Sequence, residues 1–300
     1  MNQSPPPLVS VVLASFERPQ FLVASIESVL AQSMSDFELI VADDGSGERT
    51  RALLRSFERD PRVRLLWLEH RGVPAAVRNA AIGVARGRYV AFQDSDDLWM
   101  PDKLERQLAA VSSTARWCYT ACTHIDARGE TIAPTGIQPW VAHPGDIRDA
   151  VACLRAHCAL PTVLVERELL AQAGGFDERL ALYEDHDLWL RLASRAQVAV
   201  VALPLVRVRR HTEHYSGRDE LAAAECRAVF LDRARRLELS PPAAAELRRM
   251  RGLHAAHLAR LRARAGDGSA ARLCLRDSVA DGWRYPRWWI DAAHVLLGPA

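Results

Sequence analysis

The chain has 300 residues, 49% of them hydrophobic, which is enough for one large core or two modest ones. A net charge of +2 excludes a global electrostatic field that would recruit nucleic acid, and no segment is apolar for long enough to span a bilayer. The six cysteines form no CxxC pair, so we expect free thiols in a reducing compartment. With no signal peptide visible, we expect a cytoplasmic protein, at most peripheral to the inner face of the cell membrane.

The first half of the chain alternates between apolar strands and amphipathic helices. Strands are predicted over 8–15, 37–42, 63–68 and 88–93, and helices over 19–32, 49–59 and 74–86. Four such units in a row indicate an α/β fold with a mostly parallel sheet and right-handed crossovers. A helix over 101–111 ends this half.

The second half changes character. A strand over 116–125 has the pattern of an antiparallel partner, and 127–146 is a long loop rich in Pro and Gly. Strands follow over 159–165, 198–202 and 205–209, with helices over 166–173 and 183–195, and every long segment after 217 has helical spacing. We therefore divide the chain into a disordered tail (1–8), a first half (9–112), a second half (113–216) and a C-terminal helical extension (217–300).

Polar residues follow several of the predicted strands directly. Asp94, Ser95, Asp96 and Asp97, here the 94–97 cluster, end the fourth strand, while Ser15 ends the first and Asp43-Asp44 the second. Carboxyl ends of parallel strands meet at one edge of a sheet, where α/β proteins bind ligands. Carboxylates so close together repel one another unless a cation offsets them, which favours a divalent metal carrying a diphosphate. The alternative is a solvated turn with Asp97 or Asp102 as a helix N-cap.

Five stretches, spread over 9–193, resemble the family 2 glycosyltransferases, which have the GT-A fold. They are VSVVLASFERPQFLVASIESVLAQS, FELIVADDGS, GVPAAVRNAAIGVARGRYVAFQDSDD, GGFDE and YEDHDLWLRLA, in the order of the family. Two departures are visible: Phe16-Glu17 stands where an aromatic-Asn pair is common, and Pro74-Ala75-Ala76 replaces the usual run of small residues.

The resemblance implies an inverting enzyme that moves a sugar from a nucleotide-diphosphate donor, commonly a UDP-sugar, to a hydroxyl of a glycan or lipid-linked glycan. It implies Mn²⁺ or Mg²⁺ as cofactor and a role in polysaccharide biosynthesis, with no nucleic-acid partner. A non-catalytic sugar-nucleotide binder and a nucleotidyltransferase on a related sheet are the alternatives. An RNA-binding role for the arginines late in the chain is a further one, although they lack interleaved aromatic residues.

The resemblance also assigns roles to the residues at the sheet edge. Ser15 and Asp44 would contact the nucleoside, and Asp94 and Ser95 would lie beside the donor. Asp96 would be the chief metal ligand. For Asp44 the alternative is an Asx turn, since Asp-Gly is a strong turn signal.

Three residues away from these strand ends complete the implied site. Arg78 would face the donor, His211 would lie near the metal, and Asp185 would be the catalytic base. Arg78 could instead lie on a helix surface, and His211 could be solvated or capping. Helical spacing turns Asp185 to the apolar side of its helix and pairs Asp187 with Arg191 on the exposed side, although Asp185 could also be a simple cap.

The C-terminal segment combines aromatic, apolar and basic residues. Trp283, Arg284, Arg287, Trp288 and Trp289 precede the apolar stretch 290–297. This pattern is typical of a segment at a membrane interface and equally of an amphipathic helix docked on the catalytic domain, which is the alternative we favour.

Overall fold

The computed structural model describes residues 5–133, 139–211 and 219–297. The chain forms two compact units. The first comprises Met1–Ile147, Ala156–Arg179 and Arg191–Glu213, and the second Arg148–Arg155, Leu180–Leu190 and His214–Ala300. Residues 1–4 of the predicted tail and the predicted boundary at 216 lie outside the described residues. Segments 148–155 and 180–190, which we assigned to the second half, therefore group with the C-terminal helices.

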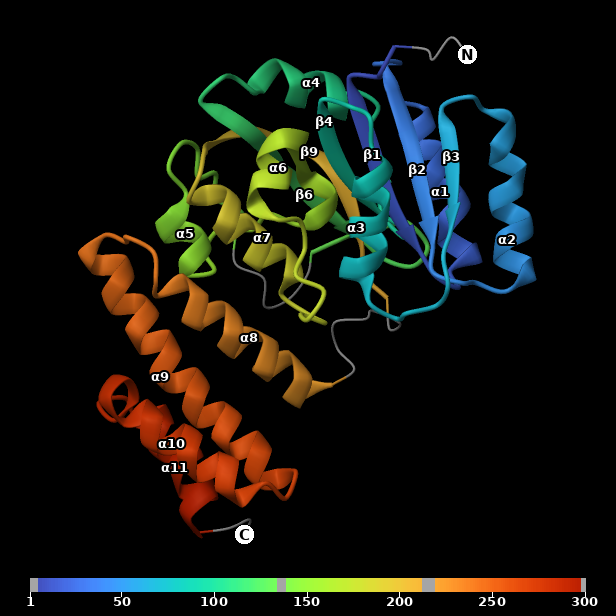
Figure 1. Cartoon of the computed structure of the whole chain (residues 1–300). Helices are drawn as coiled ribbons and strands as arrows, with labels where there is room; N and C mark the ends of the chain where they lie inside the picture. Colours follow the sequence, from blue (N-terminus) through green and yellow to red (C-terminus); the bar gives the residue numbers. More distant parts are fainter. Residues whose placement is uncertain (1–4, 134–138, 212–218, 298–300) are drawn as a thin grey trace. The chain divides into compact units, whose positions relative to one another are not determined.

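The parallel part of the predicted sheet is present in the first unit (Figure 1). It contains β1 (Val9–Ser15), β2 (Phe37–Asp43), β3 (Val63–Trp67) and β4 (Tyr89–Asp94), in the order β3-β2-β1-β4. Every neighbouring pair among them is parallel. The strands β1 and β2 are buried along almost their whole length, as expected for a sheet covered on both faces.

The other half of this sheet is mixed. The strand β8 (Val163–Glu166) lies antiparallel between β4 and β6 (Ala115–Ile125), so the predicted antiparallel partner is found. The strand β6 also pairs in parallel with β9 (Gln197–Arg209) and antiparallel with the short β7 (Thr131–Ile132). Another short strand, β5 (Leu98–Trp99), pairs antiparallel with β9.

The strand β9 is continuous where the sequence predicts two short strands. Pro204 lacks a backbone N–H, which is why we ended one strand before it. The ladder with β6 instead shifts register on both sides of the Ala121–Pro204 pair, and this irregularity absorbs the proline without ending the strand.

Helices cover both faces of the sheet in the first unit. In the view of Figure 1, α3 (Pro74–Val84) and α6 (Arg167–Ala173) lie in front of the strands and α1 (Pro19–Leu30) lies behind them. The helix α1 buries Leu22, Ile26 and Val29 against the side chains of β1, in the spacing that predicted it. This unit also contains α2 (Glu48–Arg55), α4 (Lys103–Ala110) and the short 3-10 helices Ser56–Arg59 and Leu160–Thr162.

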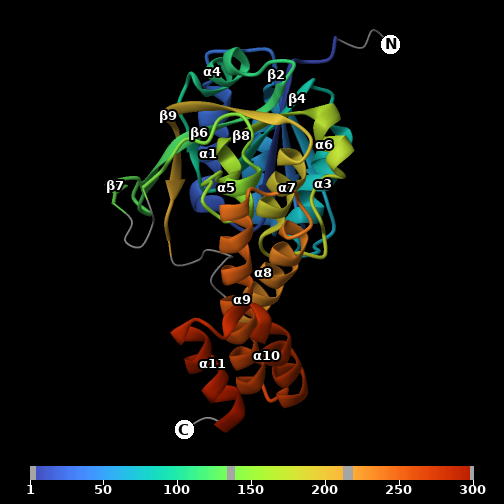
Figure 2. The ribbon, with the colours of Figure 1, turned by 90° about the vertical axis from the view of Figure 1, so that its left-hand side faces the viewer.

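The second unit is helical. It contains α5 (Arg148–Ala152), the start of α7 (Glu184–Ala193), α8 (Glu220–Ala234), α9 (Pro241–Arg264), α10 (Gly268–Gly282) and α11 (Pro286–Leu297). The last three lie side by side in both views (Figures 1 and 2). A shared core of small residues and one indole joins them, and its buried members are Ala256, Ala259, Leu275, Trp288 and Ala292.

Side-chain caps define where the helices of the second unit begin. Asp219, Ser240 and Asp267 each accept a hydrogen bond from the backbone N–H three residues later, at the starts of α8, α9 and α10. In the described part of the chain, none of the helices combines the length and apolarity that crossing a bilayer requires.

Candidate active site

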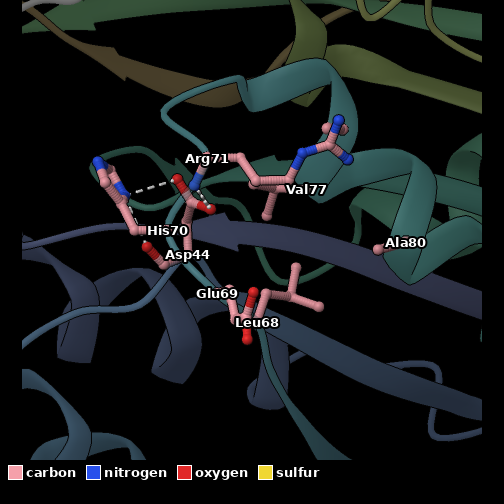
Figure 3. A pocket seen from close by; sticks show the side chains of 8 residues that line it. Asp44, Leu68, Glu69, His70, Arg71, Val77 and Ala80 are labelled. Carbon is pink, nitrogen blue, oxygen red and sulfur yellow. Dashed lines mark hydrogen bonds and ion pairs between the residues drawn. The ribbon is translucent and has the colours of Figure 1, made fainter.

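A pocket of about 310 Å³ opens at the carboxyl edge of β2 and β3, lined by Asp44 and by residues that follow β3 (Figure 3). The Asp44 carboxylate is buried and accepts hydrogen bonds from the backbone N–H groups of Arg71 and Gly72, both at 2.9 Å. The ring Nδ1 of His70 lies 3.0 Å from the same carboxylate. Asp44 is therefore held as an acceptor on the pocket wall.

The neighbouring Asp43 makes the turn that we considered for Asp44. Its carboxylate accepts from the backbone N–H and the hydroxyl of Ser46, at 2.9 and 2.5 Å. Gly45 has a φ of +76°, and a Cβ atom at this position would lie 2.8 Å from the backbone nitrogen of His70. The glycine thus allows the loop after β3 to close against Asp44.

Ser15 and Phe16 border the same region from the end of β1. Among the described residues, the buried hydroxyl of Ser15 has no hydrogen-bond partner, a cost that proteins usually avoid. The backbone carbonyl of Ser15 accepts from the Asp44 N–H at 2.9 Å. The ring of Phe16 is exposed and stacks on His70 with centroids 4.2 Å apart.

In the 94–97 cluster, Ser95, Asp96 and Asp97 are buried and Asp94 is half-buried, and arginines contact all three aspartates. Arg78 donates to Asp94 at 3.1 Å and is itself buried, so it does not lie on a helix surface. The backbone N–H of Arg209 donates to the Asp97 carboxylate at 2.7 Å. Burial, followed by the charges of Asp94 and Asp96, raises the pKa of Asp97 well above its usual value. Asp97 therefore ties the cluster to β9 and does not cap α4.

Two side chains meet at the carboxylate of Asp96. One of its carboxylate oxygens lies 2.9 Å from the Nε2 atom of His211, and Arg18 forms an ion pair with the same oxygen. The side chains of Asp96 and His211 are 6% and 5% exposed, so this contact is shielded from bulk water. The sequence-predicted pair is thus brought together at the ends of β4 and β9.

The ligand chemistry of this pair fits a divalent cation that keeps most of its coordination sphere for substrate and water. Mg²⁺ and Mn²⁺ prefer oxygen ligands, and Mg²⁺ sites commonly use one or two carboxylates plus substrate phosphates. Within the described ranges, no three His, Cys, Asp or Glu side chains form a complete metal cage. The buried Asp96 carboxylate supplies the oxygen ligand that such a partly filled site needs, and the ring nitrogen of His211 contacts this carboxylate.

Asp185 belongs to the second unit, in the first turn of α7. Its carboxylate accepts from the backbone N–H of His186 at 2.7 Å and lies 2.8 Å from the ring Nδ1 of the same residue. Burial opposes charge on this ring, but the attraction and hydrogen bond of Asp185 outweigh it and raise the pKa of His186. An Asp–His pair thus stands where we predicted a single carboxylate.

Our expectation that Asp187 forms an exposed ion pair is wrong. Its side chain is fully buried and pairs with Arg233 of α8 at 2.6 Å. Helical spacing locates neighbours on one helix, but it cannot show an arginine that arrives from another helix. Arg191, the partner we proposed, donates to the backbone carbonyls of Ala173 and Gly175.

With this geometry in view, comparison with known proteins is decisive. The sequence model of Glycosyl transferase family 2 matches residues 10–156. The Escherichia coli protein WfgD, a UDP-Glc:alpha-D-GlcNAc-diphosphoundecaprenol beta-1,3-glucosyltransferase, is 32% identical over 200 residues, which are 65% of this chain and 73% of that protein. The chain belongs to glycosyltransferase family 2.

Other relatives are matched over smaller shares of their length. TuaG of Bacillus subtilis, named as a putative teichuronic acid biosynthesis glycosyltransferase, is 34% identical over 55% of this chain and 65% of its own length. An uncharacterised Rickettsia felis glycosyltransferase is 32% identical, and the match spans 33% of it. The chain thus covers less than two thirds of these relatives.

Solved structures of low sequence identity share the fold. TarS 1–349 of S. aureus has a TM-score of 0.66 at 14% identity, covering 95% of this chain and 90% of that one. The mannosyltransferase PcManGT of Pyrobaculum calidifontis, solved with GDP-Man and Mn²⁺, has a TM-score of 0.58 at 19% identity, covering 99% and 83%. The predicted α/β fold with its GT-A-like, mostly parallel sheet and C-terminal helices is confirmed.

Three residues of the site escaped our reading of the sequence: Arg18, His70 and Arg209. His70 follows β3, so the rule that ligand sites gather at carboxyl ends of strands could have found it. We applied that rule only where a strand ended in acidic or hydroxyl residues. Arg18 and Arg209 had no such signal, because the partner of each lies more than 75 residues away.

Proposed function

We propose that the chain is a metal-dependent, inverting glycosyltransferase that uses a nucleotide-diphosphate sugar, a UDP-sugar by family analogy, and a glycan or lipid-linked glycan hydroxyl as acceptor. The observation that carries the proposal is the pairing of two features at one sheet edge. The Asp44 pocket offers a fixed acceptor for a base, and Asp96 with His211 offers a place for a metal-bound diphosphate.

The donor assignment is supported by the chemistry of the pocket and by relatives. A carboxylate held by two backbone N–H groups keeps its remaining acceptor capacity for a ring N–H, such as the imide of uracil. The unpartnered Ser15 hydroxyl is available to a nucleoside beside it. A UDP-sugar is named for WfgD, and a TarS structure contains UDP-GlcNAc.

The proposed chemistry is a single in-line displacement. A Mg²⁺ or Mn²⁺ ion held at Asp96 and His211 would offset charge on the departing nucleoside diphosphate. Arg78 and Ser95 would border the donor beside Asp94, and Asp185 would take the proton of the acceptor hydroxyl as it attacks. We place this activity in polysaccharide biosynthesis, as the names of TuaG and of the succinoglycan biosynthesis protein ExoO of Rhizobium meliloti suggest. We place it in the cytoplasm because the free cysteines suit a reducing compartment.

A donor screen tests the proposal. Thermal unfolding and sugar release are measured across nucleotide sugars, with and without Mn²⁺ or Mg²⁺. A donor at about 100 times its Kd adds roughly 2.7 kcal/mol to stability, which a melting curve resolves. We expect one donor class to stabilise the chain in a metal-dependent way, and Asp96→Ala to remove both the metal dependence and the turnover.

Two results would contradict it. Full activity in excess chelator would exclude the metal, and donor binding without turnover for any acceptor would favour a non-catalytic sugar-nucleotide binder. A matched control is Asp102→Ala, which removes a carboxylate that pairs with Arg106 on the surface, so donor binding should persist.

A further inference from the structure

The helix α11 buries one face and exposes another that is wholly apolar. On the buried side, Trp288 donates its ring N–H to Ser278 at 2.7 Å, and Asp291 pairs with Arg260 at 2.9 Å. These contacts fix α11 against α9 and α10 within the second unit. The exposed face is therefore not needed to hold the helix in place.

The exposed face, here called the α11 apolar face, is a continuous strip. At 3.6 residues per turn its members fall within about 120° of arc around the helix axis. They are Pro286, Trp289, Ile290, Ala293, Leu296 and Leu297. The four largest side chains are 57% (Trp289), 60% (Ile290), 66% (Leu296) and 85% (Leu297) exposed. Large apolar side chains gathered in this way mark an interaction surface, unlike single exposed ones.

Trp283, at the end of α10, extends this strip. Its side chain is 46% exposed, and its backbone carbonyl accepts a hydrogen bond from the ring N–H of Trp289 at 2.7 Å. The guanidinium of Arg284 lies 5.2 Å from the Trp283 ring. Two exposed indoles with an adjacent arginine thus stand at one end of the strip, a combination that suits a boundary between apolar and polar surroundings.

The exposed charged residues of α11 and of the turn before it are of one sign. Arg284 and Arg287 are exposed, and Arg287 lies on the same flank as His294. The acidic residue of this helix, Asp291, is buried and neutralised by Arg260. A second copy of the chain would bring a cationic flank to an interface that offers it no acidic counterpart. An anionic lipid surface complements both the charge and the apolar strip.

We propose that the α11 apolar face docks on an anionic membrane surface, with Arg284 and Arg287 at the level of the lipid headgroups. The helix would lie in the plane of the interface with Trp289, Ile290, Leu296 and Leu297 inserted among the acyl chains. The two arginines would add electrostatic attraction of about fivefold in partitioning each. This inference does not depend on the proposed transferase activity.

The test is flotation of the full chain with vesicles of phosphatidylcholine alone and with vesicles that also carry phosphatidylglycerol. We expect the chain to float with the anionic vesicles and much less with the neutral ones. Ile290→Glu with Leu296→Glu should reduce the bound fraction at least tenfold. Arg284→Ala with Arg287→Ala should remove the preference for anionic lipid, by about 25-fold from the two side chains together.

A matched control is Leu203→Glu, which places the same charge on an apolar side chain of β9 that is 41% exposed, and it should float as the wild type does. Circular dichroism verifies that each variant folds. If the glutamate variant does not fold, the variant that replaces both arginines still tests the proposal. Failure of the wild type to float with either vesicle overturns the proposal. A second result would also overturn it: the wild type is a dimer in ultracentrifugation and does not bind vesicles, and the glutamate variant is a monomer.

Because flotation requires no donor or acceptor, its outcome is separate from that of the donor screen. The glutamate variant should also keep the nucleotide-sugar stabilisation of the wild type, since its changed residues lie outside the proposed site. If a folded glutamate variant lost both donor binding and flotation, the membrane-binding surface and the donor site would not be independent, contrary to our inference.

Discussion

Asp185 and Asp187 lie two residues apart in α7, yet they have different partners. Asp185 bonds to His186, whereas the buried Asp187 neutralises Arg233. We expect Asp185→Asn to lower turnover by about 10²–10⁴-fold, because an amide cannot take a proton, and to leave stability within about 1 kcal/mol. Steady-state kinetics and urea unfolding measure the two quantities separately.

Asp187→Asn is the matched comparison. It leaves Arg233 without its charged partner, and breaking a buried pair costs about 3–5 kcal/mol of stability. Turnover per folded molecule should change little. If Asp185→Asn keeps most of its activity while folded Asp187→Asn loses it, the assignment of the base is wrong.

Lys103 is a buried cation that the proposed chemistry does not use. Burial lowers its pKa to about 7, while the Trp99 ring at 3.8 Å and the Gln107 side-chain oxygen at 2.6 Å favour its charged form. The unfolded chain binds this proton up to about pH 10.5, so between pH 7 and 10.5 it holds more protons than the folded chain. This group therefore makes stability rise with pH in that window and has a constant effect below it.

Lys103→Met should remove this dependence. The difference in unfolding free energy, variant minus wild type, should fall by about 3–5 kcal/mol as pH rises from 7 to 10.5. Loss of the hydrogen bond to Gln107 changes the unfolding free energy by the same amount at every pH. The test therefore depends on how the free-energy difference changes with pH, and not on its absolute value. Urea unfolding of both proteins across this range measures it, and parallel curves would exclude a depressed pKa.

The positions of candidate site residues could be predicted where local sequence carried the signal. Strand ends with polar residues gave Ser15, Asp44 and Asp96, and the structure holds these at one edge of the first unit. Partners that come from distant segments could not be predicted in this way. Arg233 reaches Asp187 across 46 residues, and periodicity within one helix contains no information about it.

At the scale of elements, α9 and α10 approach closely because of one glycine. A Cβ atom on Gly252 would lie 2.4 Å from the backbone carbonyl carbon of Asp281. Gly252→Ala should therefore destabilise the chain by about 1–3 kcal/mol, although alanine is the better helix former by about 1 kcal/mol. Thermal unfolding of the second unit's helices, followed by far-ultraviolet circular dichroism, measures this effect.

Gly83 in α3 provides the control for this substitution. No heavy atom lies within 4 Å of a Cβ built there, so Gly83→Ala should be neutral or stabilise by up to about 1 kcal/mol. Opposite signs for the two alanines would attribute the Gly252 effect to packing. Equal signs would attribute it to helix propensity and exclude the close approach.

Helices and strands with a clear hydrophobic periodicity could be predicted from the sequence. The residues at which they end and the elements that they pack against were harder to predict. The alternation of strands and helices identified β1 to β4, since each strand is a mainly apolar run that lies between helical segments of the sequence. The continuity of β9 was not predictable, because Pro204 is accommodated by a register shift that involves Ala121 of another strand. We expected α11 to dock on the catalytic domain, whereas its buried face packs on α9 and α10 of the second unit. Its sequence pattern did not identify this partner, which lies in other helices.

At the scale of the whole molecule, charge is balanced locally as well as in total. The net charge is +2, and several of the late arginines have acidic partners. Arg249 pairs with Glu246, Arg251 with Asp281, and Arg262 with Glu225, at 2.7, 3.1 and 3.0 Å. A nucleic acid would have to compete with these carboxylates for each guanidinium.

We therefore expect weak binding to RNA and heparin with a shallow dependence on salt. Each phosphate neutralised by a free basic side chain adds roughly −0.7 to the slope of log affinity against log salt for a single strand. With Arg284 and Arg287 as the contributing pair, the slope should be no steeper than about −2. Fluorescence anisotropy with a labelled single-stranded RNA across salt concentrations measures it.

The comparison with lipid makes this prediction discriminating. Anionic vesicles offer the same kind of charge as RNA together with an apolar phase for Trp289, Ile290, Leu296 and Leu297. If the chain floats with anionic vesicles but its RNA affinity depends only weakly on salt, then stable binding requires the electrostatic attraction and the apolar contact together. A slope near −5 would restore nucleic-acid binding by the arginines, and Arg248→Ala with Arg264→Ala would then identify whether α9 carries it.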